Sequence, residues 1–170
     1  SISQSRREYI RRKYFGMRTP YYINDEPERL GKGGNMKVLW ICNIMIPAIA
    51  RQLGVSYSYR EGWLSGLLER VAQEKGRNRI ELGIAFPVEE SMGNFQRNMQ
   101  LGESSSCRCY GFTENLDTPE IYDTALEGRF QEVLQDFEPD IVHIFGTEFP
   151  HTLACVRVFG QPEKTVISIQ

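Results

Sequence analysis

The sequence has no long apolar run, and this absence limits the classes of protein to which it can belong. None of its apolar segments approaches the roughly 20 residues that a membrane-spanning helix requires. The amino terminus is polar and rich in arginine, so it lacks the apolar region of a secretory signal. The formal net charge of −2 gives no overall attraction for nucleic acid. We therefore expect a cytoplasmic protein.

Cysteine and histidine are scarce, with four and two residues in the chain of 170. Cys42 and Cys155 lie within apolar segments, while Cys107 and Cys109 fall on the same face of an expected strand. A zinc site usually needs a C-x2-C pair with a second pair of ligands, and the sequence offers neither. We therefore expect reduced, buried thiols and neither a bound metal nor a cofactor.

Charge is unevenly distributed, which suggests two parts of the chain. Residues 1–18 contain six arginine or lysine residues and one glutamate, and the stretch 31–35 is a glycine-rich linker. We interpret 1–35 as a basic extension and 36–170 as one folded domain. The basic segment 1–18 either contacts an anionic partner, such as the inner face of a membrane, or is simply solvated.

After residue 35, short apolar segments alternate with amphipathic ones. The pattern predicts five strands and three helices, separated by polar loops at 43–60 and 88–106. The strands are expected at 37–42, 80–86, 107–112, 141–145 and 165–169, and the helices at 63–72, 118–137 and 150–159.

This alternation indicates an α/β fold of the Rossmann-like type, with three layers and a parallel sheet. Right-handed crossovers favour the strand order 3-2-1-4-5, numbered along the chain. The first and fourth strands are then neighbours at the switch point, and ligands bind beyond their carboxyl ends. Residues 43–62 and 146–151 would therefore border one crevice.

Several common sequence signatures are missing from that crevice. No G-x-G-x-x-G follows the first strand, and no G-x4-G-K-[ST] loop occurs. A G-x-S-x-G nucleophile elbow is also absent. These absences count against dinucleotide-dependent enzymes, P-loop nucleotidases and α/β-hydrolases.

The first candidate site is the dipeptide Glu61–Gly62 at the start of the first expected helix. Glycine permits close approach of a ligand to the backbone, and the free N–H groups of a helix amino terminus suit a phosphate. The alternative is an ordinary helix start without a ligand.

The second candidate site follows the fourth expected strand. Glu148 and His151 could bind sugar hydroxyls or transfer a proton, and we take them as catalytic candidates. Asn43, Gly146 and Thr147 are the candidate substrate or phosphate contacts beside them. The alternative is a helix-capping acid and a surface histidine.

The segments 37–42 (KVLWIC) and 139–146 (PDIVHIFG), with Gly62 between them, resemble the N-terminal domain of retaining family 4 glycosyltransferases. The resemblance covers 36–170. It implies one half of a GT-B architecture, in which this half binds the acceptor and a C-terminal half binds the nucleotide-sugar donor. It also implies sugar transfer with retention of configuration in polysaccharide or glycoconjugate synthesis, usually without an essential metal.

The resemblance also suggests roles for individual residues. Gly62 matches the glycine that approaches the donor phosphate. Many members have a histidine where this sequence has Phe145, so His151, with Glu148 beside it, is the candidate to supply an imidazole. The donor-binding domain lies outside this chain, and we therefore expect the chain alone to be inactive.

Two other readings remain open. The domain could be a non-catalytic Rossmann-like module that binds a small ligand or a protein. It could also belong to a hydrolase or epimerase with the same two-domain architecture.

Overall fold

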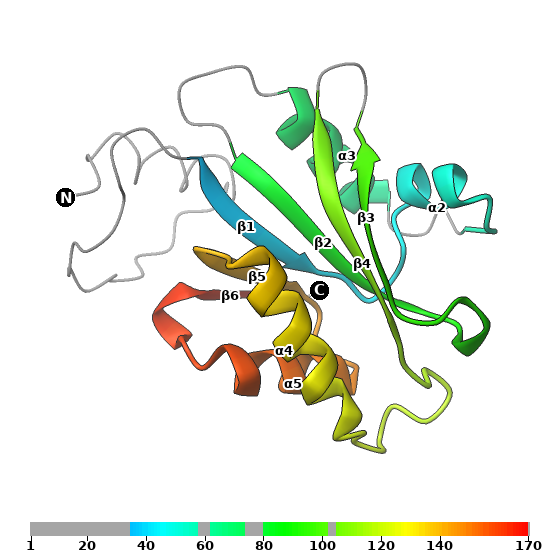
Figure 1. Cartoon of the computed structure of the whole chain (residues 1–170), viewed down its shortest axis with the longest axis vertical. Helices are drawn as coiled ribbons and strands as arrows, with labels where there is room; N and C mark the ends of the chain where they lie inside the picture. The colour runs from blue at the N-terminus through cyan, green and yellow to red at the C-terminus, as the bar shows by residue number, and fades with distance from the viewer. Residues whose placement is uncertain (1–34, 58–61, 74–79, 102–104, 170) are drawn as a thin grey trace. The chain divides into compact units, whose positions relative to one another are not determined.

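The computed structural model describes residues 35–57, 62–73, 80–101 and 105–169 (Figure 1). The chain divides between Asn35 and Met36 into two units, and the elements below belong to the second. The expected basic segment 1–18 lies outside the described residues. Within the described ranges, no helix is long and apolar enough to cross a bilayer.

In the part of the chain that the structure describes, six strands form one sheet in the order β3-β4-β2-β1-β5-β6. The strands are β1 (Met36–Ile41), β2 (Ile80–Val88), β3 (Phe95–Gln100), β4 (Ser106–Thr113), β5 (Ile141–Phe145) and β6 (Thr165–Ser168). Strand β1 is central and pairs in parallel with both β2 and β5. All pairs are parallel except β3 with β4. The protein therefore has a Rossmann-like α/β fold.

The complete strand order differs from the expected five-strand order because β3 adds an antiparallel edge strand. Residues 88–106 were expected to be a loop, and this expectation was wrong. The segment contains a short 3-10 turn, Glu90–Met92, and then β3. Most side chains of β3 are polar and exposed. A one-sided edge strand has too few apolar residues to be recognised from hydrophobicity alone.

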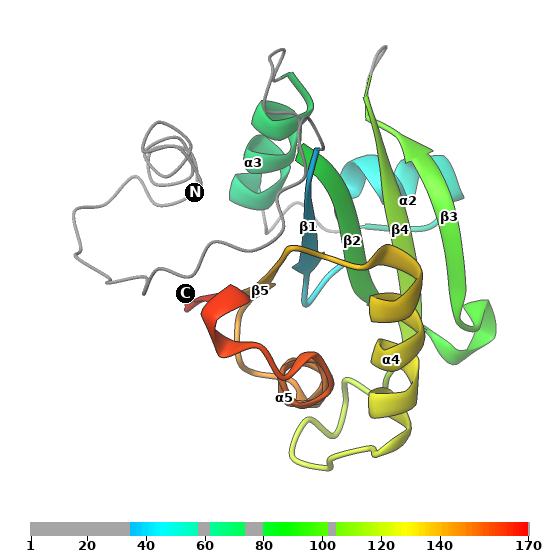
Figure 2. The same cartoon turned by 60° about the vertical axis from the view of Figure 1, so that its left-hand side comes forward.

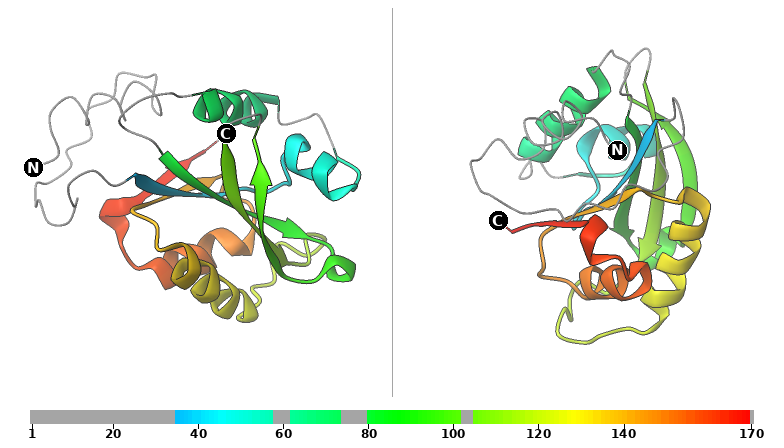
Figure 3. Two further views of the ribbon diagram at one scale, coloured as in Figure 1. Left: turned by 45° about the horizontal axis from the view of Figure 1, so that its top comes forward. Right: turned by 90° about the vertical axis from the view of Figure 1, so that its left-hand side faces the viewer.

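Within the described residues, four helices cover the two faces of the sheet. They are α2 (Pro47–Leu53), α3 (Gly62–Gln73), α4 (Ala125–Phe137) and α5 (Pro150–Phe159). Helices α2 and α3 lie on one face, and α4 and α5 lie on the other (Figures 2 and 3). The sheet is thus the middle of three layers.

Alternation along β1 shows why both faces must be covered. Leu39 and Ile41 belong to the cluster on the α4 and α5 side, together with Phe130 and Phe137 of α4. Trp40, between them, is fully buried on the opposite side and contacts Phe145 edge-on, with ring centroids 5.2 Å apart. A strand buried on both faces reads as a continuous apolar run, as the sequence predicts.

One helix was not expected, and another begins later than expected. Helix α2 lies inside the segment 43–60, which was expected to be irregular. The helix expected from Thr118 begins only at Ala125, because residues 118–121 form a turn in which Ile121 N–H donates to the Thr118 carbonyl. The carboxylate of Asp123 accepts the N–H of Ala125 at 2.8 Å, so Asp123 satisfies the start of the helix.

The four cysteines are all buried and free, as expected. Burial raises the pKa of the Cys155 thiol to about 12, and it raises the pKa of Cys42 further. Cys107 and Cys109 lie on one face of β4 with their sulfur atoms 3.5 Å apart. The Cys42 and Cys155 thiols are therefore neutral packing groups at physiological pH.

The edge strand supplies a test of the fold. The ring of Phe95 covers Gly111, its cross-strand partner, and a Cβ at residue 111 would collide with that ring. Gly111→Ala should therefore destabilise the protein by about 1–3 kcal/mol through overpacking. Denaturant unfolding measures this change.

Gly128→Ala is the matched control for that substitution. Gly128 lies inside α4, and a Cβ there would meet nothing within 4 Å. This variant should gain up to about 1 kcal/mol, because alanine is the better helix former. Equal effects of the two substitutions would show that Phe95 does not pack on Gly111.

Candidate functional site

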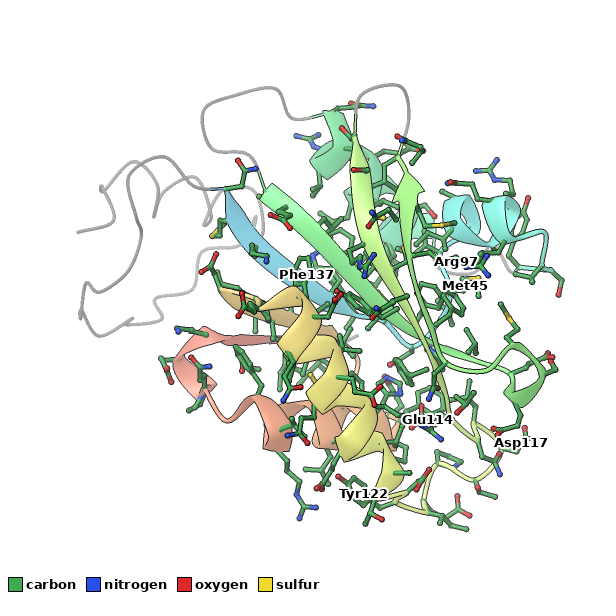
Figure 4. All side chains as sticks on the ribbon, viewed as in Figure 1. Met45, Arg97, Glu114, Asp117, Tyr122 and Phe137 are labelled. Carbon is green, nitrogen blue, oxygen red and sulfur yellow. The ribbon has the colours of Figure 1, made fainter. Side chains whose placement is uncertain are left out.

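Polar side chains follow three strands of the sheet, β1, β4 and β5, at its carboxyl edge. Asn43 follows β1, Glu114 follows β4, and Glu148 lies just after β5. Figure 4 shows Glu114 just beyond the carboxyl end of β4. These three residues and His151 of α5 are joined by hydrogen bonds, and we call the four side chains the polar cluster.

The turn after β5 depends on Gly146. Its φ of +90° is a conformation that other residues rarely adopt. A Cβ at this position would collide with the Glu148 carboxylate and the Asn43 side-chain amide. The Gly146 N–H donates to the Ser168 carbonyl at 2.8 Å, and its carbonyl accepts the Thr152 hydroxyl at 3.3 Å. Both backbone polar groups of Gly146 therefore have hydrogen-bond partners, which hold the turn in place.

His151 is fully buried in the first turn of α5. Its ring is nearly parallel to that of Phe149, with centroids 5.7 Å apart and planes at 13°. Phe112 contacts it from another direction at 5.3 Å, with the planes at 60°. Aromatic contacts on two sides leave the imidazole little freedom to rotate. Its two nitrogens consequently have fixed directions.

Glu114 binds His151 at two points. One carboxylate oxygen accepts the His151 backbone N–H at 3.0 Å, and the other lies 2.5 Å from Nδ1. The Glu114 side chain is only 3% exposed. A buried carboxylate requires such partners, since an unpaired one would carry a large desolvation cost. Asn94 supports this end of β4 by accepting the Thr113 N–H at 2.8 Å.

Asn43 connects the buried pair to the surface. Its side-chain oxygen lies 3.0 Å from His151 Nε2, and its NH2 group donates to the Glu148 carboxylate at 2.6 Å. Glu148 itself is exposed, as is its neighbour Thr147. Glu148 is therefore the most exposed member of the polar cluster.

The geometry separates the roles of the two catalytic candidates. Both ring nitrogens of His151 already have partners, so the imidazole reaches a ligand only through Asn43. Glu148 presents a carboxylate, which accepts hydrogen bonds from hydroxyl or ammonium groups and repels phosphate. The N–H groups of Gly146 and His151 are also already bonded within the protein. The arrangement favours hydroxyl recognition over phosphate recognition.

The remaining candidates lie at the start of α3. Glu61 lies outside the described residues, and Gly62 is the exposed first residue of the helix. A Cβ on Gly62 would meet nothing within 4 Å. The adjacent Trp63 packs against Phe145 at the end of β5, with ring centroids 5.4 Å apart. This contact brings the start of α3 near the end of β5.

Phe145 and His143 both face the α3 side of β5. Phe145 is buried against Trp40, Trp63 and His143, so it contributes packing at this strand end. His143 was expected to be a hydrogen-bonded core histidine, and this is confirmed. It is buried, and its Nε2 lies 2.8 Å from the Ser168 hydroxyl.

Sequence reasoning missed Glu114 as a site residue. A single glutamate after the third expected strand matches no motif, and its partner lies 37 positions away. The available signal was its position, because the carboxyl ends of parallel strands lie at one edge. No group of three or more metal-ligating side chains occurs among the residues with defined positions.

Comparison of the chain with protein-family models, curated proteins and solved structures finds no match. The resemblance to glycosyltransferases consequently rests on the sequence features of 36–170.

The buried His143 predicts a dependence of stability on pH. Burial lowers its pKa from the ordinary 6.5 to about 4. The unfolded chain therefore binds more protons between these two values, and stability falls as the pH drops through this window. His143→Gln should remove about 3 kcal/mol of the loss between pH 7 and pH 4. Urea unfolding at several pH values measures this difference. If the free energy of unfolding fell equally with pH in both proteins, the expectation would be contradicted.

Gly146 and Gly62 provide a matched pair of glycine substitutions. Gly146→Ala should cost about 2 kcal/mol or more, since it combines a strained φ with displacement of Asn43 and Glu148. Gly62→Ala should change the free energy of unfolding by less than about 1 kcal/mol. Chemical denaturation of the two variants tests this ranking. The reverse order would mean that the turn after β5 is not as constrained as its contacts indicate.

Proposed function

We propose that this chain is the acceptor-binding, N-terminal half of a sugar-nucleotide-dependent glycosyltransferase. In this proposal it is one half of a GT-B architecture, and transfer proceeds with retention of configuration, as the resemblance to family 4 implies. The observation that carries the proposal is the exposed Glu148 carboxylate, held by Asn43 at the edge where β1 and β5 end. This edge is the usual ligand position in folds of this type.

The chemistry of the polar cluster supports a hydroxylated acceptor. A carboxylate with a fixed direction accepts hydrogen bonds from sugar hydroxyls, and the exposed Thr147 hydroxyl beside it can donate or accept. A carboxylate in this position also suits the removal of a proton from an attacking hydroxyl. His151 supports this site from behind as a positioning residue.

In this proposal the phosphates of the sugar donor do not bind at the polar cluster. Two carboxylates, Glu114 and Glu148, lie in the polar cluster, and the first of them already occupies the amino terminus of α5. A phosphate there would meet negative charge and occupied N–H groups. We therefore place the nucleotide-sugar phosphates on the C-terminal half and, within this chain, only at the start of α3 near Gly62.

Saccharide binding tests the proposal on the chain as it stands. Methyl glycosides of glucose, mannose and galactose are titrated into the isotope-labelled protein, and amide chemical shifts are followed by NMR. At least one glycoside should shift Asn43, Thr147 and Glu148. Glu148→Gln should weaken its binding about tenfold, because hydrogen bonds to a charged group contribute about 1.5–3 kcal/mol.

Glu132→Gln is the control, since Glu132 is exposed on α4, outside the polar cluster, and loses the same charge. Inorganic phosphate should leave the signals of the polar cluster unchanged. Mixing the chain with nucleotide sugars and glycosides should give no transfer. Shifts confined to another surface, or turnover by the chain alone, would overturn the proposal. Binding of a protein partner at this edge without glycoside binding would favour the non-catalytic module.

A further inference from the structure

The atoms of the polar cluster determine which group donates and which accepts in each of its hydrogen bonds. An ionised carboxylate only accepts, so Asn43 directs its NH2 group to Glu148. The side-chain oxygen of Asn43 then faces His151 Nε2 at 3.0 Å, and an amide oxygen also only accepts. Nε2 must therefore carry a hydrogen. The orientation of one amide thus determines the state of one imidazole nitrogen.

The other ring nitrogen, Nδ1, lies against the Glu114 carboxylate, and a hydrogen bond between the two requires one proton. Whether that proton resides on Nδ1 or on the carboxylate, the Glu114–His151 pair is neutral as a whole. Neutrality allows both side chains to be almost completely buried, at 3% and 0% exposure, without an isolated buried charge. The net negative charge of the polar cluster then resides on Glu148, its exposed member.

Glu114 also binds the first turn of α5, the helix on which His151 lies. The residue that precedes α5, Phe149, provides no side-chain hydrogen bond to the helix start. The carboxylate of Glu114, in the loop after β4, takes this role by accepting the His151 N–H. The same carboxylate thus holds both the backbone and the ring of His151, and it acts together with Phe112 and Phe149 in setting the direction of Nε2.

We infer that Glu114 is a positioning residue that acts over three hydrogen bonds. Through His151 and Asn43 it holds Glu148 as a directed hydrogen-bond acceptor for a hydroxyl-bearing ligand. The identity of the ligand rests on the proposed function. The hydrogen-bond chain itself can be tested on the free protein.

The first test exchanges donor and acceptor between Asn43 and Glu148. Asn43→Asp replaces NH2 by oxygen, keeps the acceptor that faces His151, and places two carboxylates in contact. The folding equilibrium constant should fall about 5- to 30-fold, because like charges at this distance repel. In the double variant with Glu148→Gln, the new amide can donate to Asp, so the loss relative to Glu148→Gln alone should be under about threefold.

Asn115→Asp is the matched control for the first test. Asn115 is exposed on the loop after β4, and it uses its side-chain oxygen to accept the Asp117 N–H. The substitution adds the same charge and keeps that acceptor, so it should change the folding constant by less than about threefold. An equal loss in the single and double Asn43 variants would overturn the assigned direction of the hydrogen bonds.

The second test follows the influence of Glu114 along the polar cluster. In Glu114→Ala, the side-chain NH2 signals of Asn43 should move toward those of a solvated asparagine, and the ring nitrogen signals of His151 should change. Glu114→Gln should restore both, since its oxygen can accept the His151 N–H while its NH2 donates to Nδ1. Unchanged Asn43 signals in a destabilised Glu114→Ala protein would show that Glu114 has only a structural role and does not position Asn43.

If Glu114→Ala does not fold, the Glu114→Gln variant tests the inference in its place. Its Asn43 signals should match those of the wild type, and signals of a solvated asparagine would refute the inference. Glycoside titration of the same variants separates the two proposals. Intact NMR signatures without glycoside binding would defeat only the proposed function. Glycoside binding that is unaffected by Asn43→Asp would defeat only the positioning role.

Discussion

The pairing of β1 with β2 on one side and β5 on the other is the constraint on which the structure depends. Because β1 is central, helices must cover both of its faces, and its apolar side chains alternate between two cores. The same pairing brings the residues after β1 and β5 together at one edge. Asn43 can reach Glu148, 105 positions later in the chain, only because these two strands are parallel neighbours.

A second constraint acts on the buried end of the polar cluster. The Glu114 carboxylate and the His151 imidazole are buried together, and the contact between them gives each buried group a hydrogen-bond partner. The aromatic rings of Phe112 and Phe149 confine the imidazole, and Gly146 leaves the space that Asn43 and Glu148 occupy. Packing and hydrogen bonding thus determine a single direction for each polar group. The orientation of the exposed Glu148 carboxylate therefore depends on Asn43 and on the buried residues behind it.

Sequence patterns were sufficient for much of the architecture. The apolar segments marked the parallel strands, and Pro150 and Gly160 correctly marked the ends of α5. Strand β3 was not predicted because it lies at the edge of the sheet and most of its side chains are polar and exposed. Such a strand contains no apolar run that hydrophobicity could reveal. The start of α4 was misplaced because Pro119 suits a turn as well as a helix. These errors concern local signals that have more than one stable outcome.

For the candidate site, the sequence by itself determined which strands end near one another, since hydrophobic periodicity and the handedness of crossovers dictate their order. That reasoning selected Asn43, Gly146, Glu148 and His151. Only the tertiary structure decided that His151 is buried and that Glu114 is its partner. The physical reason is that hydrogen bonds are short and directional, so their formation depends on side-chain positions to within an ångström. Residues far apart in the chain acquire such positions only when the layers pack.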